Sequence, residues 1–344
     1  MEMMAGLSGP LTGIAGEARA LEEQGADIVG VAELGHDPLT QLTLAATGTD
    51  KVKLMTGIAV AFARSPMTLA LSAHDVNSLS GGRLMLGIGS QIKPHIEKRY
   101  SMPWSKPAAR MREYVMALKA IWAAWYDGAP LDFRGEFYNH TLMTPMFTPP
   151  DREHGAPPVL VAAVGPLMTE NAAEVADGIL LHAFTTEEYV RTVTLPAMEA
   201  GLAKAGRSRA ELQLVGAPFL VTGNTEEEFA QVRLAAVNQI AFYGSTPAYR
   251  GVLESVGYGE LQGELNALSK QGKWLEMGQC IDDALLEKIA IVGEPAEVAA
   301  KLTRRYGDIF DITQAMVFSG DAYSAGVFNT EITAALRQAA NCSV

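Results

Sequence analysis

The chain is poor in cysteine, in histidine and in long apolar runs. Only Cys280 and Cys342 occur among 344 residues, far apart, so the sequence offers no disulfide framework and no zinc spacing. The six histidines are scattered, whereas a metal-dependent hydrolase would bring several together with carboxylates. No run approaches the roughly 20 apolar residues of a membrane span. We therefore expect no bound metal, no membrane segment and a reducing compartment.

Positive charge is also scarce. There are 27 Lys and Arg against 39 Asp and Glu, a net charge of −12, and the resulting field would repel nucleic acid and anionic lipid. A local run of basic residues, which is either a solvated face or an anion contact, comprises Arg83, Lys93, Lys98, Arg99, Lys106, Arg110 and Arg112. The first residues lack the basic start and apolar stretch of a secretory signal, which predicts a cytoplasmic protein.

Several common catalytic motifs are missing. The chain contains no Gly-x-Ser-x-Gly elbow, no Gly-x-x-x-x-Gly-Lys phosphate loop and no His-x-His pair after the first strand. The short Gly87-Ile88-Gly89 is not a dinucleotide fingerprint. These absences disfavour serine hydrolases, P-loop proteins and Rossmann dehydrogenases.

What the chain does contain is a regular alternation of short apolar strands and amphipathic helices. Eight strands are expected over residues 2–7, 27–31, 53–58, 84–89, 159–163, 178–182, 212–221 and 314–318. Right-handed crossovers between eight parallel strands close into an α/β (β/α)8 TIM barrel. No linker divides the chain, so residues 1–344 are expected to form a single domain. Residues 131–138 alternate around Gly135 and predict a hairpin over one end of the barrel. Residues 243–287 break the rhythm and predict an insertion before the last helix and strand.

Residues 81–122 carry the most specific pattern. A Gly-Gly turn introduces the buried strand 84–89, glycines and Ser90 end it, and Met-Pro-Trp precedes a long helix expected over residues 107–126. This block, with residues 157–178, resembles the luciferase-like flavin and deazaflavin oxidoreductases, in particular the branch that depends on coenzyme F-420. The resemblance implies hydride transfer between reduced coenzyme F-420 and a small organic substrate, and a homodimer. The alternatives are an FMN-dependent monooxygenase and a non-catalytic flavin-binding barrel.

Gly165 and Pro166 precede a helix at the end of the fifth strand. Free N–H groups and the helix dipole there can bind an anion, or the pair simply shapes a turn. In the family this motif, followed by Ala-Asp-Gly as at 176–178, commonly receives the cofactor phosphate. The resemblance therefore assigns Ala162, Ala163, Gly165, Pro166 and Met168 to cofactor binding.

The third strand ends in Thr-Gly-Ile-Ala. In deazaflavin-dependent relatives this position carries a non-prolyl cis peptide that bulges against the cofactor ring, which makes Gly57-Ile58 the candidate bond here; the alternative is an ordinary barrel strand. The resemblance implies that the ring contacts Gly57, Ile58, Ala59, Gly89, Ser90 and Gln91.

The acid and base groups depart from the family pattern. Glu33 stands at the family's acidic position and is expected to bond a hydroxyl of the cofactor tail, but Leu34 replaces the histidine that usually follows. His36, beside Asp37, is either a proton donor or part of a helix start. Gln91 stands in place of a frequent carboxylate, which leaves His95 as a candidate donor or a surface residue. His182, at the end of the sixth strand, is the remaining candidate.

Aromatic and other apolar side chains in the loops suggest an apolar or aromatic substrate. The candidate walls of the barrel mouth are Phe62, Met146, Phe147, Phe184 and Tyr243, each of which can equally be a packing residue.

Overall fold

The predicted alternation closes into a barrel in the computed structural model, which describes residues 1–314, 316–317 and 327–341. The ring consists of parallel strands, and the pairing of β3 with β5 closes it. Its strands are β1 (Glu2–Gly6), β2 (Ile28–Val31), β3 (Lys53–Thr56) with β4 (Ala59–Val60), β5 (Leu84–Gly89), β8 (Val159–Ala163), β9 (Gly178–Leu181), β10 (Gln213–Gly216) and β13 (Ile312–Gln314). The (β/α)8 TIM barrel is thus confirmed.

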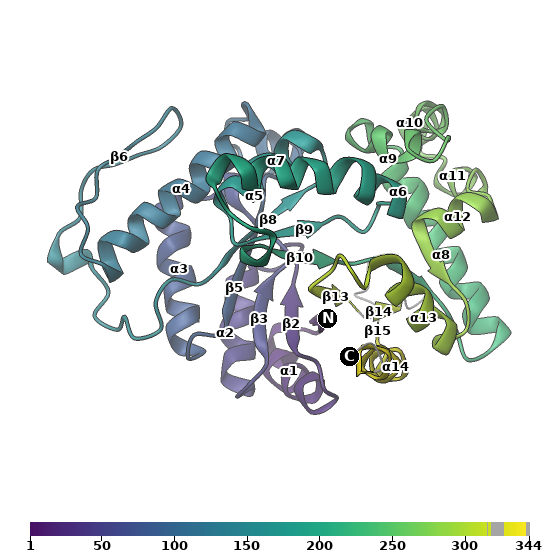
Figure 1. Cartoon of the computed structure of the whole chain (residues 1–344), viewed down its shortest axis with the longest axis horizontal. Helices are drawn as coiled ribbons and strands as arrows, with labels where there is room; N and C mark the ends of the chain where they lie inside the picture. Colours follow the sequence, from purple (N-terminus) through teal and green to yellow (C-terminus); the bar gives the residue numbers. More distant parts are fainter. Residues whose placement is uncertain (315, 318–326, 342–344) are drawn as a thin grey trace.

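Helices cover the outside of this ring (Figure 1). They are α1 (Ile14–Glu23), α2 (Pro38–Gly48), α3 (Pro66–Leu79), α4 (Pro107–Tyr126), α5 (Pro166–Val175), α6 (Glu187–Tyr189) with α7 (Leu195–Ala205), α13 (Pro295–Tyr306) and α14 (Thr330–Asn341). Proline at the first or second helical position starts α2, α3, α4, α5 and α13, where a missing N–H costs no hydrogen bond. None of the helices in the described part of the chain combines the length and apolar character needed to cross a bilayer.

The strands are buried on both faces, as parallel barrel strands must be. Their outward side chains and the helices form the main core, which includes Trp122 and Trp125 of α4. The interior is filled by a separate cluster of inward side chains, comprising Met4, Ile28, Met55, Met85, Leu160, Leu180, Val215 and Ile312. The barrel is therefore a packed core, and any site must lie at its rim.

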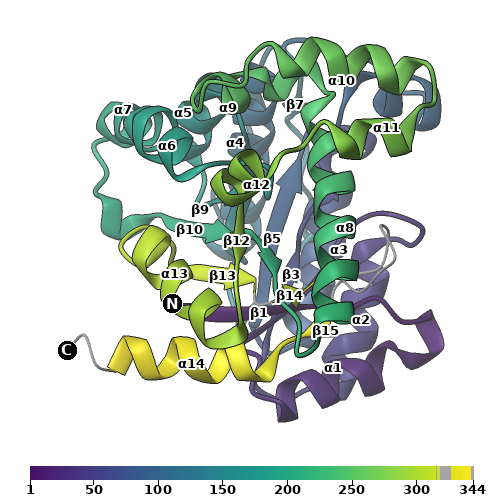
Figure 2. The same cartoon turned by 90° about the vertical axis from the view of Figure 1, so that its right-hand side faces the viewer.

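A second, four-stranded sheet extends one side of the barrel. It contains β11 (Phe219–Val221), β12 (Ala290–Val292), β14 (Met316–Val317) and β15 (Val327–Phe328). Between β11 and β12 the chain forms α8 (Glu226–Gly244), α9 (Arg250–Glu254), α10 (Leu261–Lys270), α11 (Trp274–Gln279) and α12 (Asp283–Ile289). Figures 1 and 2 show α9 to α12 gathered at one end of α8, to one side of the barrel. The irregular stretch expected at 243–287 is thus a set of short helices.

Three predicted elements differ from the structure. Strand seven is interrupted between β10 and β11, because Pro218 supplies no N–H for a continuous ladder. Strand eight begins at Ile312, earlier than the expected 314–318, and residues 315 and 318 lie outside the described part. The hairpin of β6 (Phe133–Arg134) and β7 (Asn139–His140) projects beyond α4 and does not lie over a barrel end (Figure 1).

Gly87 marks the closest approach between barrel strands. A Cβ atom at this position would lie 1.9 Å from the Thr56 carbonyl oxygen and 2.7 Å from Leu180 Cδ1. The Thr56 hydroxyl also donates to the Gly87 carbonyl oxygen at 2.6 Å, so the two strands cannot separate without losing that bond. Only glycine fits here.

We predict that Gly87→Ala destabilises the barrel by about 2–3 kcal/mol or more, because overpacking moves backbone rather than a flexible side chain. Urea unfolding would measure the loss. Gly35→Ala is the control, since a Cβ there meets no atom within 4 Å, and it should change stability by less than about 0.5 kcal/mol. Equal unfolding midpoints for the two variants would contradict the prediction.

Candidate functional site

The third strand is interrupted at the rim by a cis peptide bond between Gly57 and Ile58, at the predicted position. Gly57 is exposed, and a Cβ atom there would meet nothing within 4 Å. The Ile58 side chain turns toward the barrel interior, where Ile58 and Ala162 pack on the inward cluster. A Cβ on Gly89 would lie 2.9 Å from Ile58 Cδ1 and 3.4 Å from Ala162 Cβ. Gly57, Ile58, Gly89 and Ala162 therefore share one patch at the rim, in which Ile58 is the only large side chain.

Glu33 holds the segment that follows the cis bond at two points. Its backbone N–H donates to the Ile58 carbonyl oxygen at 3.1 Å, and its carboxylate Oε2 accepts from the Val60 N–H at 2.7 Å. The Glu33 side chain is almost fully buried. Removing a carboxylate from water is costly unless it is hydrogen-bonded and paired, so these contacts explain why a charge is tolerated here. Glu33 thus fixes the backbone of residues 58–60.

Two further side chains complete the hydrogen bonds of Glu33. Arg64 Nη1 donates to Oε2 at 2.7 Å, and the Tyr100 hydroxyl donates to Oε1 at 2.7 Å. Burial alone would lower the pKa of Arg64, but the hydrogen bonds and charges of Glu33 and Asp37 outweigh it and raise the pKa. Burial, and then the hydrogen bond to Glu33, raises the pKa of Tyr100, so its hydroxyl stays protonated. The network is a fixed unit in which the carboxylate only accepts.

The start of α5 is free of side-chain caps. Gly165 is the N-cap residue, no side chain accepts from the first turn, and that turn contains no acidic residue. The Thr169 N–H bonds the Gly165 carbonyl oxygen, whereas the N–H groups of Leu167 and Met168 have no partner within the helix. Uncapped N–H groups and the positive end of the helix dipole favour an anion.

His182 follows β9 and lies among aromatic rings. Its Nδ1 accepts from the Phe184 N–H at 3.0 Å. Its ring centroid lies 4.6 Å from that of Tyr243 and 4.7 Å from that of Tyr249. Burial lowers the pKa of His182 to about 4, so the imidazole is neutral near pH 7. Tyr243 and Tyr249 come from the end of α8 and the turn after it, so His182 joins the barrel to the helical segment.

The other predicted residues are spread around the rim. His36 is exposed, beside Asp37, which caps α2 by accepting from the Thr40 N–H at 2.9 Å. His95 starts a short π-helical turn over His95–Arg99, and its Nδ1 is buried without a hydrogen-bond partner. Among the described residues, neither imidazole forms a hydrogen bond or a ring contact with the patch around Ile58.

The side chains of several predicted cofactor residues are buried in the core or hydrogen-bonded within their own loop. Ala163 packs in the outer core, and Ala59 is fully buried. Gln91 adopts a positive φ of 59°, and its own side chain accepts from the Ile92 N–H at 3.0 Å. The Ser90 hydroxyl donates to the Gln91 carbonyl oxygen at 3.1 Å. Such residues can offer backbone atoms to a ligand.

The five candidate apolar walls of the mouth differ in burial. Phe62 and Phe184 are fully buried packing residues. Met146 and Phe147 are 86% and 66% exposed, on the long segment after the β6–β7 hairpin. Two of the five contact the candidate site residue His182: Tyr243 through its ring and Phe184 through its backbone N–H.

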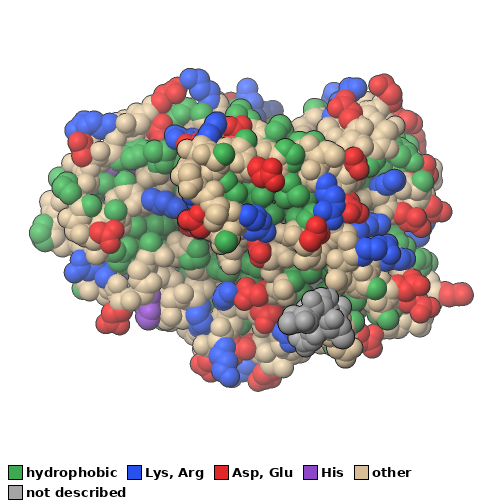
Figure 3. All heavy atoms as spheres, in the orientation of Figure 1, with side chains coloured by type: hydrophobic (Ala, Val, Ile, Leu, Met, Phe, Trp, Pro, Cys, Tyr) green, Lys and Arg blue, Asp and Glu red, His purple; other side chains and the backbone are tan. Residues whose placement is uncertain are grey.

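The basic run between 83 and 112 divides into exposed and structural residues. Arg110 is buried over the Phe62 ring at 4.3 Å, and Arg112 pairs with Glu174. Arg83 donates to the carbonyl oxygens of Val52 and Thr49 at 2.6 and 2.9 Å. Figure 3 shows acidic and basic side chains interspersed over the face it displays. Lys93, Lys98, Arg99 and Lys106 are exposed, as the solvated-face interpretation expects, whereas Arg83, Arg110 and Arg112 have structural partners.

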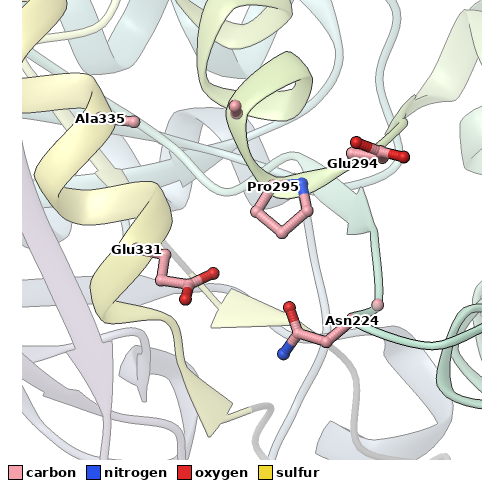
Figure 4. Close-up of a pocket in the computed structure, with 7 residues that line it drawn as sticks. Asn224, Glu294, Pro295, Glu331 and Ala335 are labelled. Carbon is pink, nitrogen blue, oxygen red and sulfur yellow. The ribbon is translucent and has the colours of Figure 1, made fainter.

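A separate cavity of about 440 Å³ lies where β11 and β12 end and α13 and α14 begin. Asn224, Glu294 and Glu331 line it, and Asn224 and Glu331 extend toward its centre (Figure 4). Two carboxylates disfavour an anionic ligand there. None of the predicted site residues lines this cavity. Within residues 1–314, 316–317 and 327–341, no three His, Cys, Asp or Glu side chains are grouped as metal ligands would be.

Sequence reasoning missed Tyr100 and Tyr249, and it gave Arg64 no role. Tyr100 lies 67 residues from Glu33 along the chain, so no local spacing connects them. Tyr249 follows Pro247 in the irregular segment, where no helical or strand period predicts which way a side chain faces. A buried acid at a strand end needs a hydrogen-bond donor. Arg64, in the loop after the next strand, is the residue from which the sequence could have predicted that partner.

Comparison with known proteins assigns the family. Residues 2–311 match the model of the luciferase-like monooxygenases. An uncharacterized protein of Mycobacterium tuberculosis is 50% identical over 294 residues, 86% of each chain. A 5,10-methylenetetrahydromethanopterin reductase of Archaeoglobus fulgidus is 30% identical over 270 residues, 76% of each chain. The solved coenzyme F-420-dependent tetrahydromethanopterin reductase of Methanopyrus kandleri has the same fold, with a TM-score of 0.75 and 22% identity over 91% of this chain and 92% of that one. The chain belongs to the luciferase-like monooxygenase family of oxidoreductases.

Proposed function

We propose that this protein is an oxidoreductase that transfers a hydride between reduced coenzyme F-420 and a small organic substrate. The observation that carries the proposal is the patch of Gly57, Ile58, Gly89 and Ala162 at the rim, where three of the four residues carry no side chain larger than a methyl group, on strands that neighbour the uncapped start of α5. A planar ring needs a surface without projecting side chains, and a phosphorylated tail needs free N–H groups. Both are offered by β3, β5 and β8 and the helix that follows β8.

The residues that would hold the coenzyme divide into two groups. Ile58, Gly89 and Ala162 would contact the ring, with Ala59, Ser90 and Gln91 offering backbone atoms beside it. Gly165, Pro166 and Met168, with Ala163 behind them, would hold the phosphate at the start of α5. Glu33 would act through the backbone of residues 58–60, because its carboxylate is already bonded by Val60, Arg64 and Tyr100. When bound, reduced coenzyme F-420 supplies a hydride to the substrate.

Coenzyme F-420 is preferred to FMN because a putative coenzyme F-420-dependent oxidoreductase of Mycobacterium tuberculosis is 27% identical to this chain over 320 residues, and the solved Methanopyrus reductase of the same fold is named as dependent on coenzyme F-420. His182, His36 and His95 remain the candidate donors to the substrate, which we propose to be apolar or aromatic. We further propose a single-domain cytoplasmic protein that forms a homodimer, as the family likeness implies.

Side-by-side titration tests the proposal. The purified protein is mixed with coenzyme F-420 or with FMN, and binding is followed by the absorbance and fluorescence of each cofactor. Tighter binding of coenzyme F-420 supports the proposal, and oxidation of its reduced form by carbonyl or alkene acceptors shows turnover. Preference for FMN with oxygen consumption would favour a monooxygenase. Binding without oxidation by any acceptor would favour the non-catalytic barrel.

We predict that Gly165→Asp weakens coenzyme F-420 binding by at least about tenfold, because like charges about 4 Å apart repel by about 1–4 kcal/mol near a protein surface. The same change should not reduce stability, since Asp is a good N-cap and a Cβ at Gly165 meets nothing within 4 Å. Gly165→Asn is the matched control, because it caps the helix without charge. Equal affinity of the Asp and Asn variants would place the phosphate elsewhere.

We also predict that Glu33→Gln lowers both stability and coenzyme affinity. Gln cannot neutralise Arg64, and the change should cost about 2–4 kcal/mol in urea unfolding because one partner of a buried pair is lost. Asp37→Asn removes the exposed partner of Arg64 and keeps a good N-cap, so it should cost less than about 1 kcal/mol and leave the affinity unchanged. A Glu33→Gln protein that binds coenzyme F-420 as tightly as the native one would show that the 58–60 backbone needs no such support.

A further inference from the structure

His182 is held in a defined orientation by three neighbours. The Phe184 N–H donates to Nδ1, the Tyr243 ring meets the imidazole at an interplanar angle of 86°, and the Tyr249 ring lies at 32° to it. Phe184 itself packs beside both tyrosines, at 6.4 and 5.8 Å between centroids. The imidazole therefore cannot rotate without breaking a hydrogen bond and two ring contacts.

One polar atom of this ring is left over. His182 is only partly buried, and its Nε2 bonds none of the described residues. Nε2 is not fully buried and keeps some solvent-accessible surface. His182 directly follows β9, which pairs with β8, the strand of Ala162. The free nitrogen thus lies at the rim, one strand from the patch of Gly57, Ile58, Gly89 and Ala162.

The hydrogen bond to Nδ1 sets the tautomer. An N–H donor on the Phe184 backbone requires a lone pair on Nδ1, so in the neutral ring the proton resides on Nε2. The titratable groups packed against the ring are the hydroxyls of Tyr243 and Tyr249. Burial raises the pKa of Tyr243, and burial followed by the neighbouring Tyr243 raises the pKa of Tyr249 to about 12. Neither tyrosine carries charge near neutrality, so nothing there favours an imidazolium.

We propose that His182 presents a fixed Nε2–H donor to the carbonyl oxygen of the substrate, and that the substrate is a carbonyl compound with an apolar or aromatic body. The proposal rests on the proposed function. The accessible Nε2–H is free to donate to a bound ligand, and the rings of Tyr243 and Tyr249 beside it form an apolar surface.

The reaction balances with a neutral histidine. Reduction of a carbonyl to an alcohol adds one hydride at carbon and one proton at oxygen. The hydride comes from the reduced coenzyme, the C=O π pair moves to the oxygen, and solvent water supplies the proton. His182 keeps its own proton and stabilises the charge that develops on the oxygen through the hydrogen bond. It orients the carbonyl and is not itself the acid.

Nitrogen NMR of the whole protein, labelled with 15N in the histidine rings, tests the first half of this proposal. The His182→Gln variant lacks one set of ring signals and so assigns them. We expect a pyrrole-type Nε2 and a pyridine-type Nδ1 that stay unchanged between pH 5.5 and 8.5. A protonated Nδ1, or a ring that titrates within that range, would overturn the proposal.

Binding of benzamide to the protein loaded with oxidised coenzyme F-420 tests the second half. Benzamide carries a carbonyl on an aromatic body. We expect it to shift the Nε2 signal, and we expect His182→Phe, which keeps a ring in the aromatic cluster, to weaken benzamide binding about three- to tenfold. His182→Gln, which keeps an N–H donor, should stay within about threefold of the native protein. No shift, or equal binding by the Phe variant, would overturn the proposal.

The two proposals fail in different ways. If coenzyme F-420 does not bind, the proposed function is wrong, whereas the tautomer is still measured on the protein alone. If the coenzyme binds but the ring carries its proton on Nδ1, or benzamide leaves Nε2 unchanged, the proposed function stands and the role of His182 is wrong. Thermal melting of both variants confirms that each is folded.

Discussion

The architecture depends on how closely β3 approaches β5 at the rim. Thr56 and Gly87 meet with no room for a Cβ atom, and the Thr56 hydroxyl bonds the Gly87 carbonyl oxygen. Because the pairing of β3 with β5 closes the ring, this contact lies where the barrel closes. It also determines the shape of the rim, because the next inward position along β5 is again glycine and carries no side chain. The glycines of β5 thus allow both the close contact with β3 and a position at the rim that carries no side chain.

The buried carboxylate of Glu33 stabilises the backbone of residues 57–60 at this rim. Residues 57–60 leave the regular ladder, and backbone without a ladder needs other partners. Glu33 supplies them from the neighbouring strand, while Arg64 and Tyr100 satisfy its oxygens. Both carboxylate oxygens of Glu33 therefore already have hydrogen-bond partners within the protein. This explains how the family's acidic position can be retained here beside Leu34, without the usual histidine.

The sequence predicts the barrel well where local signals agree and poorly where contacts are distant. The strand 84–89 and the helix 107–126 have the expected bounds, because glycine or proline and an apolar period mark both ends. Strand eight was displaced because 314–318 is as apolar as the true strand, and only pairing with β1 and β10 selects residues 312–314. Phe62 and Phe184 were assigned to the mouth because both follow strands, yet loop residues have no period that distinguishes buried from exposed sides. The bonds of Glu33 to Val60, Arg64 and Tyr100 span 27 to 67 residues and cannot be read from spacing.

The two sides of the rim differ in a way that follows from the order of the chain. Strands β3, β5 and β8 end in glycine, alanine and backbone turns, whereas β9 ends in His182 under rings from the helical segment. Flat surface without donors suits a ring that is held by shape, and a fixed N–H donor beside aromatic faces suits a second molecule held by one hydrogen bond. Tyr243 and Tyr249 belong to the helical segment. Substitutions there can therefore change which second molecule binds beside His182 without altering the residues of β3, β5 and β8. Under the proposals made above, substrate choice and cofactor choice would be controlled by different segments of this chain.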